Sequence, residues 1–119
     1  IKDNHTDFAG GIPEAVRSCQ RYLADLGLQL PIEVETRNLS EVAIALSVPG
    51  IQRIMLDNFG FDNLDKAVRM INGACETEAS GGITLANARA YAECRVDYIS
   101  VGALTHSAGS IDLSLKAMI

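Results

Sequence analysis

The spacing of short strand-like segments constrains the fold of this chain more than any other feature. Apolar or β-branched runs end at Glu35, Asp57, Ser80 and Gly102, which follow one another at intervals of 22, 23 and 22 residues. Between these runs, apolar residues recur at helical spacing. Strands and helices that alternate in this way predict parallel strands joined by crossover helices. The equal length of the units favours an α/β barrel, and a doubly wound sheet is the alternative.

The individual elements follow from apolar patterns and capping residues. Strands are expected at 32–36, 53–57, 76–80 and 97–101. Helices are expected at 13–26, at 39–46 behind the Asn38 and Glu41 capping pattern, from Asp62 or Asn63 to 71, and at 85–94 behind Thr84. A short amphipathic tail is expected from Ile111.

Four and a half strand–helix units cannot close an eight-stranded barrel. Ile1 to Asn4 has the pattern of a strand end, and the chain does not begin with Met. We therefore expect either an incomplete barrel or the second half of one, with further sequence upstream.

Composition excludes several classes of protein. The net charge is −5, with 10 basic against 15 acidic residues, which argues against a general nucleic-acid or anionic-membrane surface. No apolar run approaches the roughly 18 residues of a membrane-spanning helix. The cysteines, Cys19, Cys75 and Cys94, are odd in number and far apart, which argues against a disulfide framework or a structural zinc site.

Candidate ligand-binding residues stand where the strands end, because parallel α/β folds bind ligands beyond the carboxyl ends of their strands. These are Lys2, Glu35, Asp57, the turn Ser80-Gly81-Gly82 and the turn Val101-Gly102-Ala103. Glycine lets the backbone approach a ligand, and helix N-termini favour anions. Two such turns in neighbouring terminal loops favour a phosphate site, and the alternative is that the glycines only make tight turns.

The two acidic strand ends suggest a site for positive charge. Glu35 and Asp57 are expected close together on neighbouring strands, where they would hold Mg²⁺ or stabilise a developing cation. The alternative is that arginines or helix N-termini satisfy them. Lys2 would pair with an anionic substrate, or else be solvated in a frayed terminus. The only histidines, His5 and His106, are too far apart in sequence to suggest metal-ligand spacing.

Five motifs occur in order and carry a resemblance to a known family. They are Ile1–His5, Glu33–Glu35, Met55–Asn58, Glu78–Gly82 and Asp97–Ser107. Together they resemble the quinolinate phosphoribosyltransferases, also called carboxylating nicotinate-nucleotide pyrophosphorylases, from Ile1 to about Lys116. In two places the sequence departs from the pattern. Arg95 stands where relatives often have Gly, and the tail before Ile111 lacks a basic residue.

The resemblance implies a fold and an activity. The family transfers phosphoribosyl from phosphoribosyl pyrophosphate (PRPP) to quinolinate with Mg²⁺, and releases pyrophosphate and CO2. The product is nicotinate mononucleotide, an intermediate of NAD biosynthesis. Residues 1–119 would be the C-terminal part of an incomplete, TIM-like α/β barrel with parallel strands, without the N-terminal domain and the first barrel strands. A homodimer or higher homo-oligomer is implied, in the cytoplasm or, for a plant or alga, in an organelle.

The resemblance also implies roles for single residues. Lys2 would contact anionic substrate groups, and Glu35 and Asp57 would lie beside the ribose and the metal. The two turns, Ser80-Gly81-Gly82 and Val101-Gly102-Ala103, would bind phosphate with His106 nearby. The arginines that grip quinolinate would lie upstream, so we expect these 119 residues alone to be inactive. A related phosphoribosyltransferase for another aromatic acid and a non-catalytic phosphate-binding barrel are the alternatives.

Overall fold

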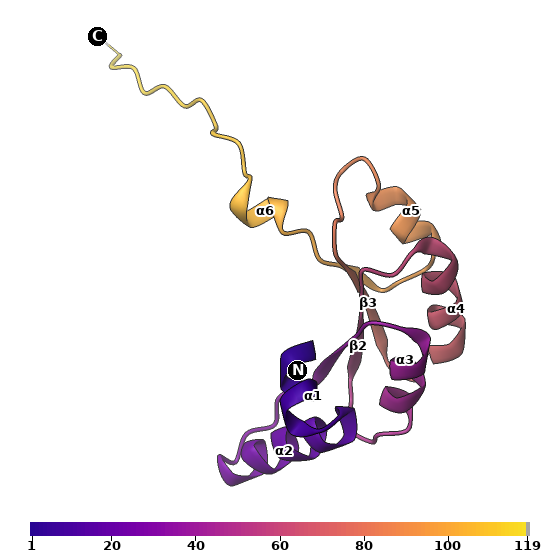
Figure 1. Cartoon of the computed structure of the whole chain (residues 1–119). Coiled ribbons are helices and arrows are strands. Elements are labelled where there is room, and N and C mark those ends of the chain that lie inside the picture. The colour runs from indigo at the N-terminus through magenta and orange to yellow at the C-terminus, as the bar shows by residue number, and fades with distance from the viewer. Residues whose placement is uncertain (119) are drawn as a thin grey trace.

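The computed structural model describes residues 1–118 and contains one parallel sheet with helices packed against it (Figure 1). Its elements, in order, are α1 (Asp3–Ala9), α2 (Ile12–Asp25), β1 (Glu33–Thr36), α3 (Leu39–Leu46), β2 (Arg53–Asp57), α4 (Phe61–Ile71), β3 (Glu76–Ser80), α5 (Ala88–Glu93), β4 (Tyr98–Ile99) and α6 (Ala103–His106). The α/β class and the parallel strands are as the sequence predicts.

The strand order favours a barrel over a doubly wound sheet. The strands lie side by side in sequence order, β1-β2-β3-β4, and every neighbouring pair is parallel. When parallel strands follow one another in unbroken order, right-handed crossovers place all the connecting helices on one face of the sheet. In a doubly wound sheet the strand order reverses, and helices cover both faces. Figure 1 shows α3, α4 and α5 on the same side of the sheet. The arrangement is that of a segment of barrel wall.

The two faces of the sheet differ in chemistry. Val34, Ile54 and Leu56 are fully buried and face the helices, where they meet Val42 and Leu64. Burial of these apolar side chains is the main source of stability for the layer. Because side chains alternate along a strand, the intervening residues share the opposite face. That face carries Glu33, Glu35, Arg53, Met55, Asp57, Glu76, Glu78 and Ser80, and in a closed barrel it would line the interior.

The first residue continues the sheet beyond β1. The Ile1 amino group donates to Glu33 O at 2.6 Å, and Ile1 O accepts from Glu35 N at 2.9 Å. This is the bond pattern of a parallel pair centred on Val34. The expected strand end at Ile1 to Asn4 is therefore right only for Ile1, because Asp3 and Asn4 belong to helix α1. Helix α1 follows directly, and the sequence pattern did not predict it.

Several predicted boundaries are wrong. Helix α4 begins after Gly60, so neither Asp62 nor Asn63 is its cap. Helix α5 begins at Ala88 rather than 85, because the Asn87 side chain accepts from Thr84 N at 2.7 Å and donates to Gly82 O at 3.1 Å. These bonds close residues 84–87 into a turn, so Thr84 caps no helix.

The C-terminal elements are shorter than expected. Strand β4 has only two residues, Tyr98–Ile99, instead of the five predicted. Residues 107–118 form no helix or strand, and Figure 1 shows them leading away from the sheet. Ile111 and Leu113, the start of the expected amphipathic tail, are exposed there. No helix among residues 1–118 is long and apolar enough to cross a lipid bilayer.

Candidate active site at the carboxyl ends of the strands

Asp57 and Ser80 form the centre of the candidate site. They are the last residues of β2 and β3 and are partners in the parallel register, so both lie on the polar face at the carboxyl edge. Asp57 is half-buried, and its Oδ2 accepts from the Asn58 amide at 2.6 Å. It takes part in no ion pair among residues 1–118, which leaves its charge available to a ligand.

Glu35 lies on the same face but deeper. Its register partner on β2 is Met55, two residues before Asp57. Two residues correspond to about 6.6 Å along a strand, so the acids are staggered rather than side by side. Within the described chain the Glu35 carboxylate has neither an arginine nor a helix N-terminus as partner. For Glu35, the structure therefore does not show the alternative in which an arginine or a helix N-terminus pairs with the acid.

Lys2 is the basic residue of the candidate site. Since Ile1 pairs with Val34, Lys2 follows at the level of Glu35, on the polar face. Its backbone is held, because Lys2 O accepts from His5 N at 3.0 Å and from Thr6 N at 3.2 Å. The side chain is exposed and joins no ion pair among the described residues. Lys2 is thus a fixed helix cap with a free ammonium group, rather than part of a frayed terminus.

The first glycine turn has a conformation that needs glycine. Gly81 and Gly82 have φ of +94° and +61°, in the left-handed region that glycine adopts without strain. Ile83 is buried and fastens the turn to the core. The helix expected to begin beside the turn starts only at Ala88. Any phosphate contact here would therefore come from the N–H groups of the turn itself, and not from the end of α5.

The second turn is placed differently. Gly102 has φ of −58°, so its backbone does not require glycine. A Cβ there would meet His106 Nε2 at 3.0 Å, so glycine leaves room for the imidazole. Figure 1 shows α6 on the side of the sheet away from α5. The phosphate site that Val101, Gly102, Ala103 and His106 were expected to share with the first turn stays a prediction.

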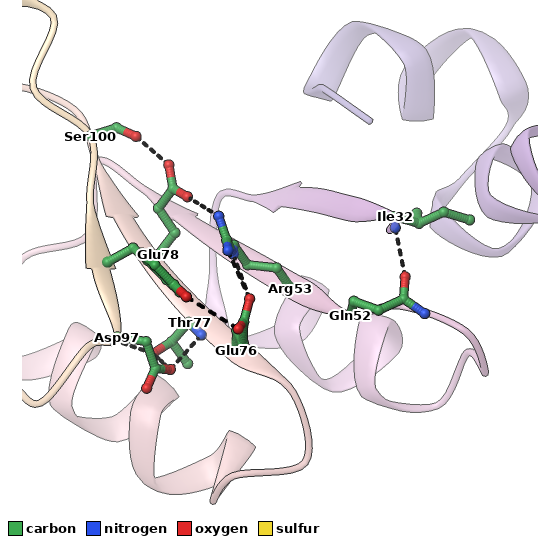
Figure 2. A network of polar contacts seen from close by, with 9 residues as sticks. Ile32, Gln52, Arg53, Glu76, Thr77, Glu78, Asp97 and Ser100 are labelled. Atoms are coloured by element: carbon green, nitrogen blue, oxygen red, sulfur yellow. Dashed lines mark hydrogen bonds and ion pairs between the residues drawn. The ribbon is translucent and has the colours of Figure 1, made fainter. Parts of the chain in front are cut away.

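A polar network crosses the inner face nearer the start of the strands (Figure 2). The Arg53 guanidinium pairs with Glu76 at 2.7 Å and with Glu78 at 3.0 Å. Glu78 is buried and also accepts from the Ser100 hydroxyl. Burial and the neighbouring Glu78 carboxylate raise the pKa of Glu33, one of whose oxygens has no partner among the described residues. Sequence patterns missed this network because only the strand register brings its members together.

A second polar contact fastens β4 to the sheet (Figure 2). The Asp97 carboxylate accepts from Thr77 N at 2.8 Å and from the Thr77 hydroxyl at 2.7 Å. These hydrogen bonds from Thr77 lower the pKa of Asp97. This contact adds to the backbone pairing of the two-residue strand β4 with β3.

The fold and the strand ends together define a segment of an α/β barrel whose ligand face carries acids, a lysine and a glycine turn. Residues 1–116 match the family described as quinolinate phosphoribosyl transferase, C-terminal domain. The chain belongs to this family.

Individual relatives agree with this assignment. The chain is 46% identical, over 98% of its length, to the chloroplastic carboxylating nicotinate-nucleotide pyrophosphorylase of Oryza sativa subsp. japonica, of which it covers 35%. It is 42% identical, over 98% of its length, to a mitochondrial decarboxylating quinolinate phosphoribosyltransferase of Nicotiana tabacum, of which it covers 37%. The chain thus spans little more than a third of these relatives.

Solved structures share the fold. NadC from Streptococcus pyogenes superposes with a TM-score of 0.87 at 32% identity, over 98% of this chain and 40% of that one. The nicotinate-nucleotide pyrophosphorylase from Ehrlichia chaffeensis superposes with a TM-score of 0.76 at 37% identity, over 90% of this chain and 37% of that one. The expected C-terminal part of this family's barrel is thereby confirmed as the fold.

Proposed function

We propose that the protein containing this chain transfers the phosphoribosyl group of PRPP to quinolinate and releases pyrophosphate and CO2. The product would be nicotinate mononucleotide, for NAD biosynthesis. The names of the relatives support this reaction. The observation that carries the proposal is that Lys2, Glu35 and Asp57 share the polar face of the sheet, with the Ser80-Gly81-Gly82 turn at the carboxyl edge of that face.

The acids would act on the ribose. Breaking the bond at the anomeric carbon of PRPP develops positive charge on the ring, and a fixed carboxylate lowers the energy of that state. Asp57, at the strand end, and Glu35, deeper on the next strand, would face the sugar from two levels. Their stagger would allow contacts at two levels of one ribose ring.

The glycine turn and the lysine would hold the anionic groups. Backbone N–H groups of Ser80, Gly81 and Gly82 would bind the 5′-phosphate, which fixes the sugar relative to the acids. Lys2 would pair with a negatively charged part of the substrates, since its ammonium group is exposed and unpaired among the described residues.

The donor set fits a magnesium ion held jointly with substrate. Mg²⁺ commonly binds through one or two carboxylates plus substrate phosphates, and Glu35 and Asp57 offer carboxylate oxygens on one face. Residues 1–118 contain no group of three or more acidic, histidine or cysteine ligands that would hold an ion alone. When bound, the ion would neutralise charge on the pyrophosphate leaving group.

The remaining parts of the site would come from outside this chain. The quinolinate-binding arginines are proposed to lie upstream, and the protein to act as a homodimer or larger homo-oligomer. The proposed compartment is the cytoplasm, or an organelle if the source is a plant or alga. Plant relatives whose names include "chloroplastic" and "mitochondrial" support the second location.

Substitution of Asp57 tests the proposed site in the full-length protein. Asp57→Asn should reduce kcat at least about a hundredfold, because the charge that stabilises the ribosyl cation is lost. Binding of ribose 5-phosphate, followed by calorimetry, should persist. Asp62→Asn is the matched control, since Asp62 is exposed in the first turn of α4 and should leave kcat unchanged. Unchanged turnover in Asp57→Asn would refute the proposed role of Asp57. A wild-type protein that binds ribose 5-phosphate but shows no turnover would instead favour a non-catalytic binding barrel.

A further inference from the structure

Asn58 links the two parts of the candidate site. Its side-chain Nδ2 donates to Asp57 Oδ2 at 2.6 Å, and its backbone N donates to Ser80 O at 2.9 Å. A Cβ built on Gly81 would lie 2.9 Å from the Asn58 nitrogen and would also overlap the Asn58 amide. One residue thus contacts the carboxylate that ends β2 and packs directly against the glycine turn that follows β3.

The backbone conformation of Asn58 also indicates that its side chain has a specific role. Asn58 has φ of +55°, in the left-handed region, although it is not glycine. Such conformations cost free energy, and asparagine tolerates them better than most residues. Glycine would adopt this conformation with no strain. The presence of asparagine therefore suggests that the side chain has a use, and its amide bond to Asp57 supplies one.

We propose that Asn58 is a positioning residue, which fixes the orientation of the Asp57 carboxylate and sets it against the Ser80-Gly81 turn. The inference rests on the proposed function, in which Asp57 acts on the ribose and the turn binds the phosphate. With both groups held by one residue, the sugar would meet the carboxylate at a fixed distance from its phosphate. Loss of the amide would then slow the chemical step more than it weakens binding.

The chain offers a matched control for this idea. Asn72 has φ of +45° and is likewise exposed, but it ends α4 at the opposite edge of the sheet. Asn58→Gly and Asn72→Gly therefore make the same chemical change in the same backbone conformation. Both should leave the thermal midpoint of the full-length protein close to that of the wild type, because glycine tolerates positive φ.

The test compares steady-state kinetics of both variants with PRPP and quinolinate. Asn58→Gly should lower kcat about tenfold, with KM for PRPP changed less than threefold, since a misdirected carboxylate slows reaction without removing phosphate contacts. Asn72→Gly should retain wild-type kcat. If Asn58→Gly does not fold, Asn58→Asp decides, since it keeps the size and tolerance of positive φ but loses the donor.

Two results would overturn the inference while leaving the proposed function intact. One is wild-type kcat in Asn58→Gly, or in Asn58→Asp where that variant decides. The other is an equal fall of kcat in Asn58→Gly and Asn72→Gly. Either result counts only if the wild-type protein turns over quinolinate and Asp57→Asn loses that turnover. Absence of wild-type turnover would instead refute the proposed function.

Discussion

The guanidinium carbon of Arg53 lies 3.9 Å from the centroid of the Tyr98 ring, so a residue of β2 reaches across β3 to β4. On the way it pairs with Glu76 and Glu78, and the Tyr98 hydroxyl donates to Glu76 at 3.2 Å. Hydrogen bonds and a cation–π contact therefore join three strands on the polar face. This cross-strand connection is the main feature of the inner face below the candidate site.

Removal of this cation should destabilise the sheet. Arg53→Met leaves the buried Glu78 carboxylate without its ionic partner, and an uncompensated buried charge is strongly unfavourable. The thermal midpoint of the full-length protein should fall by several degrees. Arg69→Met is the control, because Arg69 pairs with Asp65 on an exposed helix face and such pairs contribute little. Equal midpoints for the two variants would contradict the assigned role of Arg53.

Glu33 should make stability depend on pH. Burial and Glu78 raise the pKa of Glu33 in the folded state, so the folded protein binds a proton more tightly than the unfolded chain. Stability is then lost as the pH rises through the folded pKa. Glu33→Gln should remove this loss, and its stability relative to the wild type should increase from pH 4 to pH 7. A difference in midpoint that does not vary with pH would contradict the prediction.

Arg95 occupies a conformation that glycine would adopt more easily. It follows α5 with φ of +62°, at the position where relatives were expected to carry Gly. Arg95→Gly should raise the free energy of unfolding by up to about 1 kcal/mol, measured by chemical denaturation. Arg89→Gly, inside α5, should lower it by a similar amount, because glycine is unfavourable within a helix. Destabilisation by both changes would show that positive φ at Arg95 is not strained.

The two glycines of the first turn should differ in their tolerance of alanine. Both have positive φ, but a Cβ on Gly81 overlaps Asn58, whereas one on Gly82 has no atom within 4 Å. Gly81→Ala should therefore raise KM for PRPP and lower kcat more than Gly82→Ala does. Steady-state kinetics of the full-length variants measure both constants. Greater damage from Gly82→Ala would indicate that backbone conformation, and not the contact with Asn58, decides the effect.

The sequence predicted the regular parts of the fold well, because their patterns are local. Arg53–Asp57 and Glu76–Ser80 have the predicted strand bounds, and Asn38 caps α3 as expected. Helix α1 was missed because its seven residues lack an apolar stripe and bury only Thr6. Part of its support is distant in sequence, since Asp7 pairs with Arg37 at 3.0 Å. No local pattern records such a contact.

The candidate site was predictable in position but not in detail. The ends of the expected strands singled out Lys2, Glu35 and Asp57 as candidates, because parallel strands share one carboxyl edge. The stagger between Glu35 and Asp57 depends on the register, which the residue pattern alone does not reveal. The contact between Asn58 and Gly81 joins two left-handed residues that follow neighbouring strands, and no local sequence pattern records it.

The most direct test of the account is product formation by the full-length protein. The protein would be incubated with PRPP, Mg²⁺ and either quinolinate or nicotinate, and nicotinate mononucleotide would be followed by chromatography. We expect product from quinolinate, with release of one CO2 per nucleotide, and little from nicotinate. Product from nicotinate alone, or from neither acid, would contradict the proposed reaction.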